Sequence, residues 1–228
     1  SLQQAIQKRL QMFVLRSKVT LRDASGDQVL LGVISREAKS APLMALAHST
    51  RQTTIQLSPH RSLVRVDSGS ASALWESMVQ GGAAEAGESA WRLAGIAEGI
   101  YSLTPETQEQ FVPQMVNFDL AGGVSIKKGC YPGQENVART QHRGILKRRM
   151  VRVECAAALK AGDAVFAPEF GDQPAGQVAD AVTRSDGISE ALVVAQLEPI
   201  RAQSLRTADA VALRVLLLPY RVAELEAA

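Results

Sequence analysis

The sequence has few of the residues that usually hold metal ions. Its 228 residues include two cysteines and three histidines, and neither a CxxC pair nor an HExxH motif occurs. Structural zinc sites and iron–sulfur clusters generally take four such ligands, so we expect no metal to be bound by this chain alone. Two isolated cysteines also form no disulfide framework. This favours a reducing compartment, such as a bacterial cytoplasm or a mitochondrial matrix.

Long apolar runs and an excess of one sign of charge are absent as well. No apolar stretch approaches the roughly 20 residues that cross a bilayer, so we expect no membrane span. The 25 basic and 23 acidic residues leave a formal net charge of +2. Because general binding to nucleic acid needs a strongly basic surface, we expect no direct nucleic-acid partner. Any electrostatic recognition must therefore be local.

The first part of the sequence predicts a mixture of helices and strands. Apolar residues recur at helical spacing over residues 2–15, and the alanine-rich residues 36–48 and residues 71–80 also predict helices. Four runs rich in β-branched and other apolar residues predict strands: residues 18–23, 28–34, 53–57 and 62–67. Residues 88–100 predict a further helix, interrupted by glycines. The pattern is that of an α/β or α+β fold, and for the whole chain we predict the α+β class.

From Lys147 onward the pattern changes to short apolar or alternating runs separated by Gly, Asp and Pro. The runs are residues 148–156, 163–169, 176–183, 190–197 and 211–220. Several short strands at this spacing predict a small β-barrel or sandwich. We place the domain boundary near Gly144, giving domains at residues 1–144 and 145–228. Cys155 lies within an alternating strand pattern, which predicts a buried core residue.

The main chemical candidate is the sequence KKGCYPGQENVAR at residues 127–139, which we call the cysteine segment. Cys130 follows two lysines and precedes a Pro–Gly turn that leads into a predicted helix, with Glu135 in its first turn. A helix N-terminus and adjacent cations stabilise a thiolate. Lowering a thiol pKa from about 8.5 to about 6.5 raises the thiolate fraction at pH 7 from roughly 3% to roughly 75%. The alternative is a small buried hydrophobic residue.

A cluster of basic residues follows Cys130. Its members are Arg139, His142, Arg143, Lys147, Arg148 and Arg149. One interpretation is a solvated helix face and linker. The other is an anion site for a small molecule that carries a carboxylate, because the cations are clustered while the total charge is near zero.

Residues 128–135, KGCYPGQE, resemble the signature of the YgfZ-type folate-binding proteins, which are relatives of the glycine cleavage T protein, an aminomethyltransferase. The resemblance extends over residues 111–148 and includes the opening residues 15–33 and the closing LLLPY at residues 216–220. It implies a partial T protein-like α/β folate-binding portion followed by a small C-terminal β-barrel. It also implies that roughly the first hundred residues of the family precede the point where this chain begins.

The resemblance further implies a function. Family members bind tetrahydrofolate or a derivative and support assembly or repair of iron–sulfur client enzymes, including one that thiomethylates tRNA. Cys130 is then the reactive centre, and Lys128 lowers its pKa. The residues implied for folate binding are Glu98, Lys127, Tyr131, Gly133, Gln134, Glu135, Arg139 and Arg143.

The assignment of Glu98 involves a departure from the pattern of the related transferases. Their R-x-E-A-G stretch provides an acid that pairs with the edge of the pterin ring. The matching residues 95–100 here read GIAEGI, which puts Glu98 one place later and Gly95 where the arginine would stand. A carboxylate at this place can still accept the paired N–H donors of a pterin.

Two other functions stay open at this point. The chain could be a folate-dependent one-carbon transferase of the aminomethyl type, with folate as a substrate. This reading ranks second because the cysteine of residues 128–135 is not part of the transferase pattern. The chain could also be a thiol-bearing interaction module that binds no folate, so whether it is an enzyme is uncertain.

Overall fold

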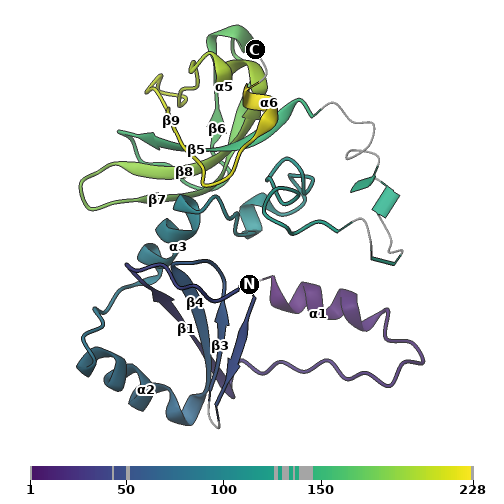
Figure 1. Cartoon of the computed structure of the whole chain (residues 1–228). Helices are drawn as coiled ribbons and strands as arrows, with labels where there is room; N and C mark the ends of the chain where they lie inside the picture. The colour runs from purple at the N-terminus through teal and green to yellow at the C-terminus, as the bar shows by residue number, and fades with distance from the viewer. Residues whose placement is uncertain are drawn as a thin grey trace. The chain divides into compact units, whose positions relative to one another are not determined.

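The structure is a computed structural model that describes residues 2–42, 44–49, 52–125, 128–129, 134–135, 137–138 and 146–226. The chain divides into two compact units, Ser1–Ala94 and Gly95–Ala228. Each unit contains an antiparallel β-sheet together with helices (Figure 1), so the predicted α+β class is confirmed. The predicted boundary near Gly144 lies outside the described residues. No helix in the described ranges combines the length and the apolar character needed to cross a membrane.

The first unit contains a four-stranded sheet in the order β1-β4-β3-β2. The strands are β1 (Gln28–Ile34), β2 (Leu46–His48), β3 (Gln52–Gln56) and β4 (Arg61–Asp67). The helices are α1 (Gln3–Gln11), α2 (Ser68–Gln80) and α3 (Glu88–Ala97), the last of which continues into the second unit. The predicted helices at 2–15, 71–80 and 88–100 and the strands at 28–34, 53–57 and 62–67 are therefore confirmed, within a few residues.

Two predictions for the first unit are wrong. The described residues of the range 36–48 form no helix, because their backbone pairs with other segments: the amide of Lys39 donates to the carbonyl of Pro59. The amide of Met44 donates to the carbonyl of Gln56 at 2.7 Å, and β2 then pairs with β3. Pro42, which has no amide hydrogen, also disfavours a helix here. Residues 18–23 form no strand, because no described strand pairs with them.

The second unit contains a five-stranded antiparallel sheet in the order β6-β7-β8-β5-β9. The strands are β5 (Arg148–Cys155), β6 (Ala164–Val165), β7 (Gly176–Thr183), β8 (Ser189–Gln196) and β9 (Arg214–Leu216). There are also four short helices: η1 (Pro105–Thr107) precedes β5, and η2 (Pro168–Phe170), α5 (Leu197–Arg201) and α6 (Ala223–Glu226) lie between or after the strands. Each of the five runs predicted from residue 148 onward overlaps one of these strands, with β8 beginning one residue earlier than predicted.

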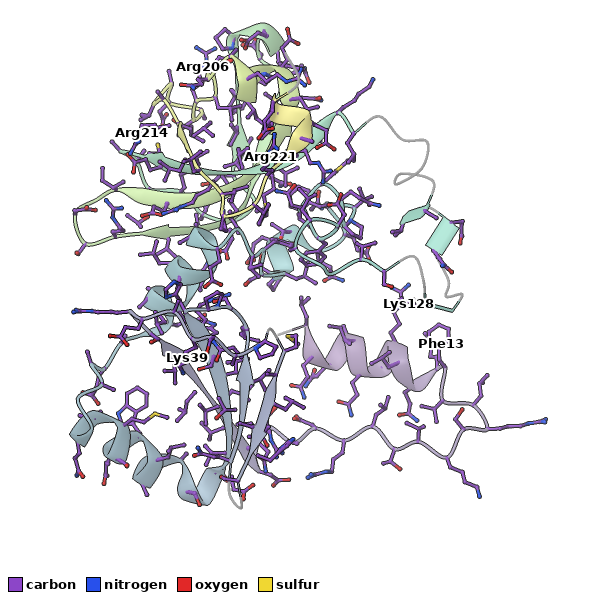
Figure 2. The ribbon with its side chains drawn as sticks, in the orientation of Figure 1. Phe13, Lys39, Lys128, Arg206, Arg214 and Arg221 are labelled. Carbon is purple, nitrogen blue, oxygen red and sulfur yellow. The ribbon has the colours of Figure 1, made fainter. Side chains whose placement is uncertain are left out.

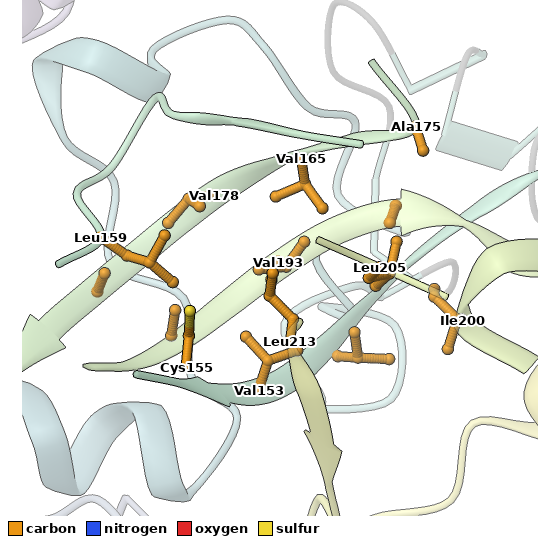
Figure 3. Close-up of a cluster of buried hydrophobic side chains, with 14 of the residues drawn as sticks. Val153, Cys155, Leu159, Val165, Ala175, Val178, Val193, Ile200, Leu205 and Leu213 are labelled. Carbon is orange, nitrogen blue, oxygen red and sulfur yellow. The ribbon is translucent and has the colours of Figure 1, made fainter. Parts of the chain in front are cut away.

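The core of the second unit is formed by small and branched side chains from the sheet (Figure 3). Val153, Val178 and Val193 are fully buried there, and Leu205 and Leu213 from the later loops pack with them. Cys155 belongs to the same cluster and is 2% exposed, so its predicted place in the core is confirmed. Burial raises the pKa of the Cys155 thiol, because the charged thiolate is disfavoured away from water.

Candidate functional site

The structure describes part of the predicted site. Lys127, Cys130, Tyr131, Gly133, Arg139 and Arg143 lie outside the described residues. Lys128 is exposed (Figure 2), and Glu98 is half-buried in the turn after α3. Gln134 and Glu135 are helical, as are Val137 and Ala138. These helical residues agree with the prediction that a helix follows Cys130 in the sequence.

A buried glutamine binds this helical part of the cysteine segment. The Gln114 side-chain amide donates a hydrogen bond to the carbonyl of Val137 at 2.8 Å. Gln114 itself is 1% exposed and lies in a run of turns between η1 and β5. Its side-chain Oε1 is also buried and has no hydrogen-bond partner among the described residues. Within the described residues, Gln114 therefore donates through its side-chain Nε2 while its side-chain oxygen has no partner.

The backbone of Gln114 is held in turn by Arg149. The Arg149 Nη1 donates to the Gln114 carbonyl at 2.7 Å and to Asp119 Oδ1 at 2.8 Å. Nη2 donates to Asp119 Oδ2 at 3.0 Å and to Glu224 Oε1 at 2.6 Å, and Nε donates to Glu224 Oε1 at 3.1 Å. A guanidinium has five N–H donors, so these bonds use all of them.

The surroundings of Arg149 correct one interpretation of the basic cluster. Its side chain is 4% exposed and is paired with two carboxylates, so it is not available to an external anion. Burial alone lowers the pKa of its guanidinium, but the hydrogen bonds to Asp119 and Glu224 more than offset this and raise the pKa above its ordinary value. Arg149 is a structural cation. His142, Arg139 and Arg143 of the same cluster lie outside the described residues.

Arg148, by contrast, is exposed: it is the first residue of β5, and it lies on the other face of the strand from Arg149, since successive residues of a strand face opposite ways. It lines a hollow of about 230 Å³ together with Gln110, Phe111 and Gln177. Lys147 is exposed as well. Of the described members of the basic cluster, Lys147 and Arg148 thus keep the exposure that an anion site requires.

A second set of buried hydrogen bonds involves Asn117 and Tyr220. The fully buried Asn117 donates through Nδ2 to the carbonyl of Met150 in β5 at 2.9 Å, and more weakly to the Tyr220 hydroxyl at 3.4 Å. The Tyr220 hydroxyl donates to the carbonyl of Gly99 at 2.7 Å. Burial raises the pKa of the Tyr220 hydroxyl above its ordinary value, although the hydrogen bond to Asn117 opposes this.

The turn that carries Glu98 depends on this contact. Gly99 has φ +66°, a conformation that favours glycine. A Cβ at Gly99 would lie 2.6 Å from the Tyr220 hydroxyl oxygen and 2.7 Å from Leu218 Cδ2, so no larger residue fits without a shift. The closing LLLPY of the sequence therefore packs directly on the residue after Glu98.

These contacts form what we call the buried polar network: Gln114, Asn117, Asp119, Arg149 and Tyr220. It joins the turn after Glu98, residues 111–120, strand β5 and the helical part of the cysteine segment. The sequence did not predict these residues as a group. The one available signal was that Gln114, Asn117 and Tyr220 lie within the segments that carry the family resemblance. Within the described residues, no group of three or more His, Cys, Asp or Glu could hold a metal ion.

The fold and the site together define an α+β protein in which a buried polar network is hydrogen-bonded to the described helical part of the cysteine segment. A scan against protein-family models finds no match. A relative from Escherichia coli called tRNA-modifying protein YgfZ is 31% identical over an alignment of 239 positions, which covers 94% of this chain and 70% of that protein. A relative of the same name from Vibrio vulnificus is 31% identical over 156 residues, or 65% of this chain and 47% of that protein.

The chain therefore belongs to the YgfZ family. It spans about half the length of the Vibrio relatives, at 47% and 46%, and 70% of the Escherichia coli relatives that it matches.

Proposed function

We propose that this chain is a tetrahydrofolate-binding accessory protein that supports assembly or repair of iron–sulfur enzymes, and through them tRNA modification. Cys130 is its reactive group. The observation that carries the proposal is membership of a family whose relatives are named for tRNA modification. This chain spans only part of the length of those relatives. That it has the activity of a full-length relative is therefore itself proposed.

The proposal includes the finer fold: a T protein-like portion at residues 1–144 and a C-terminal β-barrel at residues 145–228. Strand pairing in the second unit supports a barrel. Arg206 bridges to Phe166, directly after β6, and also to Ala212. Two residues later the chain enters β9, which pairs with β5 at the other edge of the sheet. Residues 212–216 thus connect both edges, which is how a barrel removes its edge strands.

The charges of the predicted site residues match those of a folate. The half-buried Glu98 offers a carboxylate that can accept the paired N–H donors of a pterin. Arg139 and Arg143 provide cations for the carboxylates of the folate tail. Bound folate would supply or accept a one-carbon unit. The chain's own part is to orient the folate and to present the Cys130 thiolate beside Lys128, acting on clusters that client enzymes hold.

Binding of tetrahydrofolate, measured by isothermal titration calorimetry, tests the ligand. We expect binding in the micromolar range and about tenfold weaker binding by Glu98→Gln, which removes a charge-assisted hydrogen bond. Glu169→Gln provides the control, because Glu169 contacts Ser204 and lies outside the proposed site. No binding to the unaltered chain at high micromolar concentration would contradict the folate part of the proposal.

Complementation tests the thiol. In bacteria that lack their own relative, expression of this chain should restore the thiomethylated nucleosides of tRNA, and Cys130→Ser should not. Cys155→Ala is the matched control, because it removes the other thiol, which is buried in the core. Full restoration by Cys130→Ser would remove the thiol from the mechanism. Formation of methylenetetrahydrofolate from an aminomethyl donor would instead identify the transferase alternative.

A further inference from the structure

We propose that the hollow lined by Arg148 is a binding site for an N-acylated apolar amino acid, either free or as the last residue of a peptide. The hollow has a volume of about 230 Å³ and lies in the second unit, on the sheet whose strands are labelled in Figure 1. Of the described residues predicted to bind folate, none lines it. The inference therefore goes beyond the proposed function and does not depend on it.

The hollow lies on the face of the sheet that residues 110 and 111 cover. In the strand register Met150 pairs with Val194, and Val194 pairs with Gln177. Since alternate residues of a strand share a face, Arg148, Gln177 and Val194 all lie on this face. Phe111 packs against the hydrophobic cluster of the same face. Small residues complete much of the lining and fill little space: Gly162, Ala164 and Gly176.

Arg148 is the one charged residue among the described residues that line the hollow. It is exposed, and within the described residues its guanidinium has no acceptor. The other two arginines of β5, Arg149 and Arg152, are both paired with carboxylates. A guanidinium with available N–H donors binds a carboxylate through two parallel hydrogen bonds. The hollow therefore favours a ligand that carries a carboxylate.

The other groups of the hollow match a peptide group and an apolar side chain. Gln177 Nε2 donates to the carbonyl of Gly162 at 3.1 Å, and its Oε1 can accept from an N–H of the ligand. Gln110 is exposed, and its side-chain amide can donate to a ligand carbonyl. Phe111 and Val194 provide apolar walls. A carboxylate, a peptide group and an apolar side chain together make up an N-acylated amino acid.

The walls of the hollow are held in place by the fold itself. The ring of Phe111 meets the ring of Tyr101 edge-on, with 6.0 Å between centroids and 83° between planes. The buried Tyr101 hydroxyl is in turn hydrogen-bonded to Thr107 Oγ1 at 2.7 Å. Pairing with β8 fixes the backbone of Arg148, and the side-chain hydrogen bond fixes Gln177. Groups that are already positioned lose less entropy when a ligand binds.

An NMR titration of the unaltered chain with N-acetyl-L-leucine, without folate, tests the site. The backbone amide signals of Gln110, Gly162 and Val194 should shift with one dissociation constant of about 1 mM, since the ligand is small and the walls are partly exposed. N-acetyl-L-leucinamide lacks the carboxylate and should bind about tenfold more weakly, the effect of losing a charge-assisted hydrogen bond. Acetyl-Gly-Gly-Gly-Leu distinguishes the two sources. Tighter binding than N-acetyl-leucine assigns the site to peptide C-termini, and equal or weaker binding assigns it to the free amino acid derivative.

Two variants remove the site in different ways. Arg148→Gln removes the cation and should weaken the binding of N-acetyl-leucine about tenfold, while the binding of the leucinamide stays the same. Ala164→Phe, at an exposed position of β6, keeps the cation but fills the hollow, so it should abolish the binding of both. Arg221→Gln is the control, because Arg221 is exposed, pairs with Glu226 and lies outside the lining.

The unbound spectra of all three variants should match that of the unaltered chain away from the substituted residue, which shows that the fold is retained. Equal binding of N-acetyl-leucine by Arg148→Gln and the unaltered chain overturns the proposal, as do signals that shift only outside the hollow. Retained binding by Ala164→Phe overturns it independently of the charge. None of these results involves tetrahydrofolate, so this proposal and the proposed function fail separately.

Discussion

Arg149 and Arg148 are neighbours in β5 and have opposite surroundings. Arg148 is exposed at the edge of a hollow, whereas Arg149 is buried and donates to Gln114, Asp119 and Glu224. Composition treats the two arginines alike, and so did the prediction of one basic cluster. Their side chains lie on opposite faces of the strand, and Arg148 is exposed at the first position of β5, whereas Met150 on the same face as Arg148 is buried. The surroundings of each arginine therefore depend on its position in β5.

The contribution of the planar guanidinium of Arg149 to stability can be tested by substitution. The substitution Arg149→Lys keeps the positive charge. Lysine, however, has three N–H donors for the four oxygen atoms that accept from Arg149, and these donors do not lie in a plane. We expect the second unit to lose about 2 kcal/mol of stability, measured as the urea concentration at which Cys155 becomes reactive. Arg221→Lys, at an exposed pair with Glu226, should leave that midpoint unchanged. Equal effects of the two variants would contradict the special role of Arg149.

At the scale of elements, sequence patterns predicted the strands of the second unit better than the alanine-rich residues 36–48. The strands β7 and β8 are buried on both faces, so their runs of apolar residues carry the signal directly. Residues 36–48 have helix-forming alanines but pair with β3 and with the turn before β4. Tertiary hydrogen bonds there override a weak local preference.

In the candidate site, too, short sequence patterns were predictive, whereas contacts between residues far apart in the chain were not. The cysteine segment could be singled out from a short motif. Gln114, Arg149 and Tyr220 could not be assigned, because their partners lie 23, 35 and 121 residues away along the chain. No local pattern encodes contacts at such separations. The motif therefore predicts a candidate site, and only the fold reveals the hydrogen bond to the described part of the cysteine segment.

Burial of Cys155 in the sheet core predicts a pH effect on this element. Burial raises the thiol pKa in the folded state above its unfolded value of about 8.5. Below pH 8.5 the full stability is present. As the pH rises from there through the folded pKa, the unfolded chain loses its proton first, so stability falls. Urea midpoints of the second unit measured between pH 8 and 9.5 should decline less steeply in Cys155→Ala than in the unaltered chain.

The matched variant for this test is Cys130→Ser, which should keep the full decline because Cys155 is intact. Tyr101 and Tyr220 also have raised pKa values, which come into play at higher pH, so the comparison is confined to the range below 9.5. Identical slopes in Cys155→Ala and the unaltered chain would show that this thiol does not govern the alkaline loss.

At the scale of the whole molecule, the two units differ in how much apolar surface they bury. Among the described hydrophobic residues of the first unit, only Val64 and Val66 are buried, whereas Phe13, Leu30 and Leu46 are exposed. The second unit buries two clusters of hydrophobic side chains. Since apolar burial is the main favourable term in folding, the first unit should be the less stable one.

The sequence provides a separate probe for each unit. Both tryptophans, Trp75 and Trp91, lie in residues 1–94, and the buried Cys155 lies in residues 95–228. In the Cys130→Ser variant, tryptophan fluorescence reports the first unit and thiol labelling reports the second. We expect the fluorescence transition at a lower urea concentration than the rise in Cys155 labelling. Coincident midpoints would mean that the chain unfolds as one cooperative body, because different probes of a two-state transition agree.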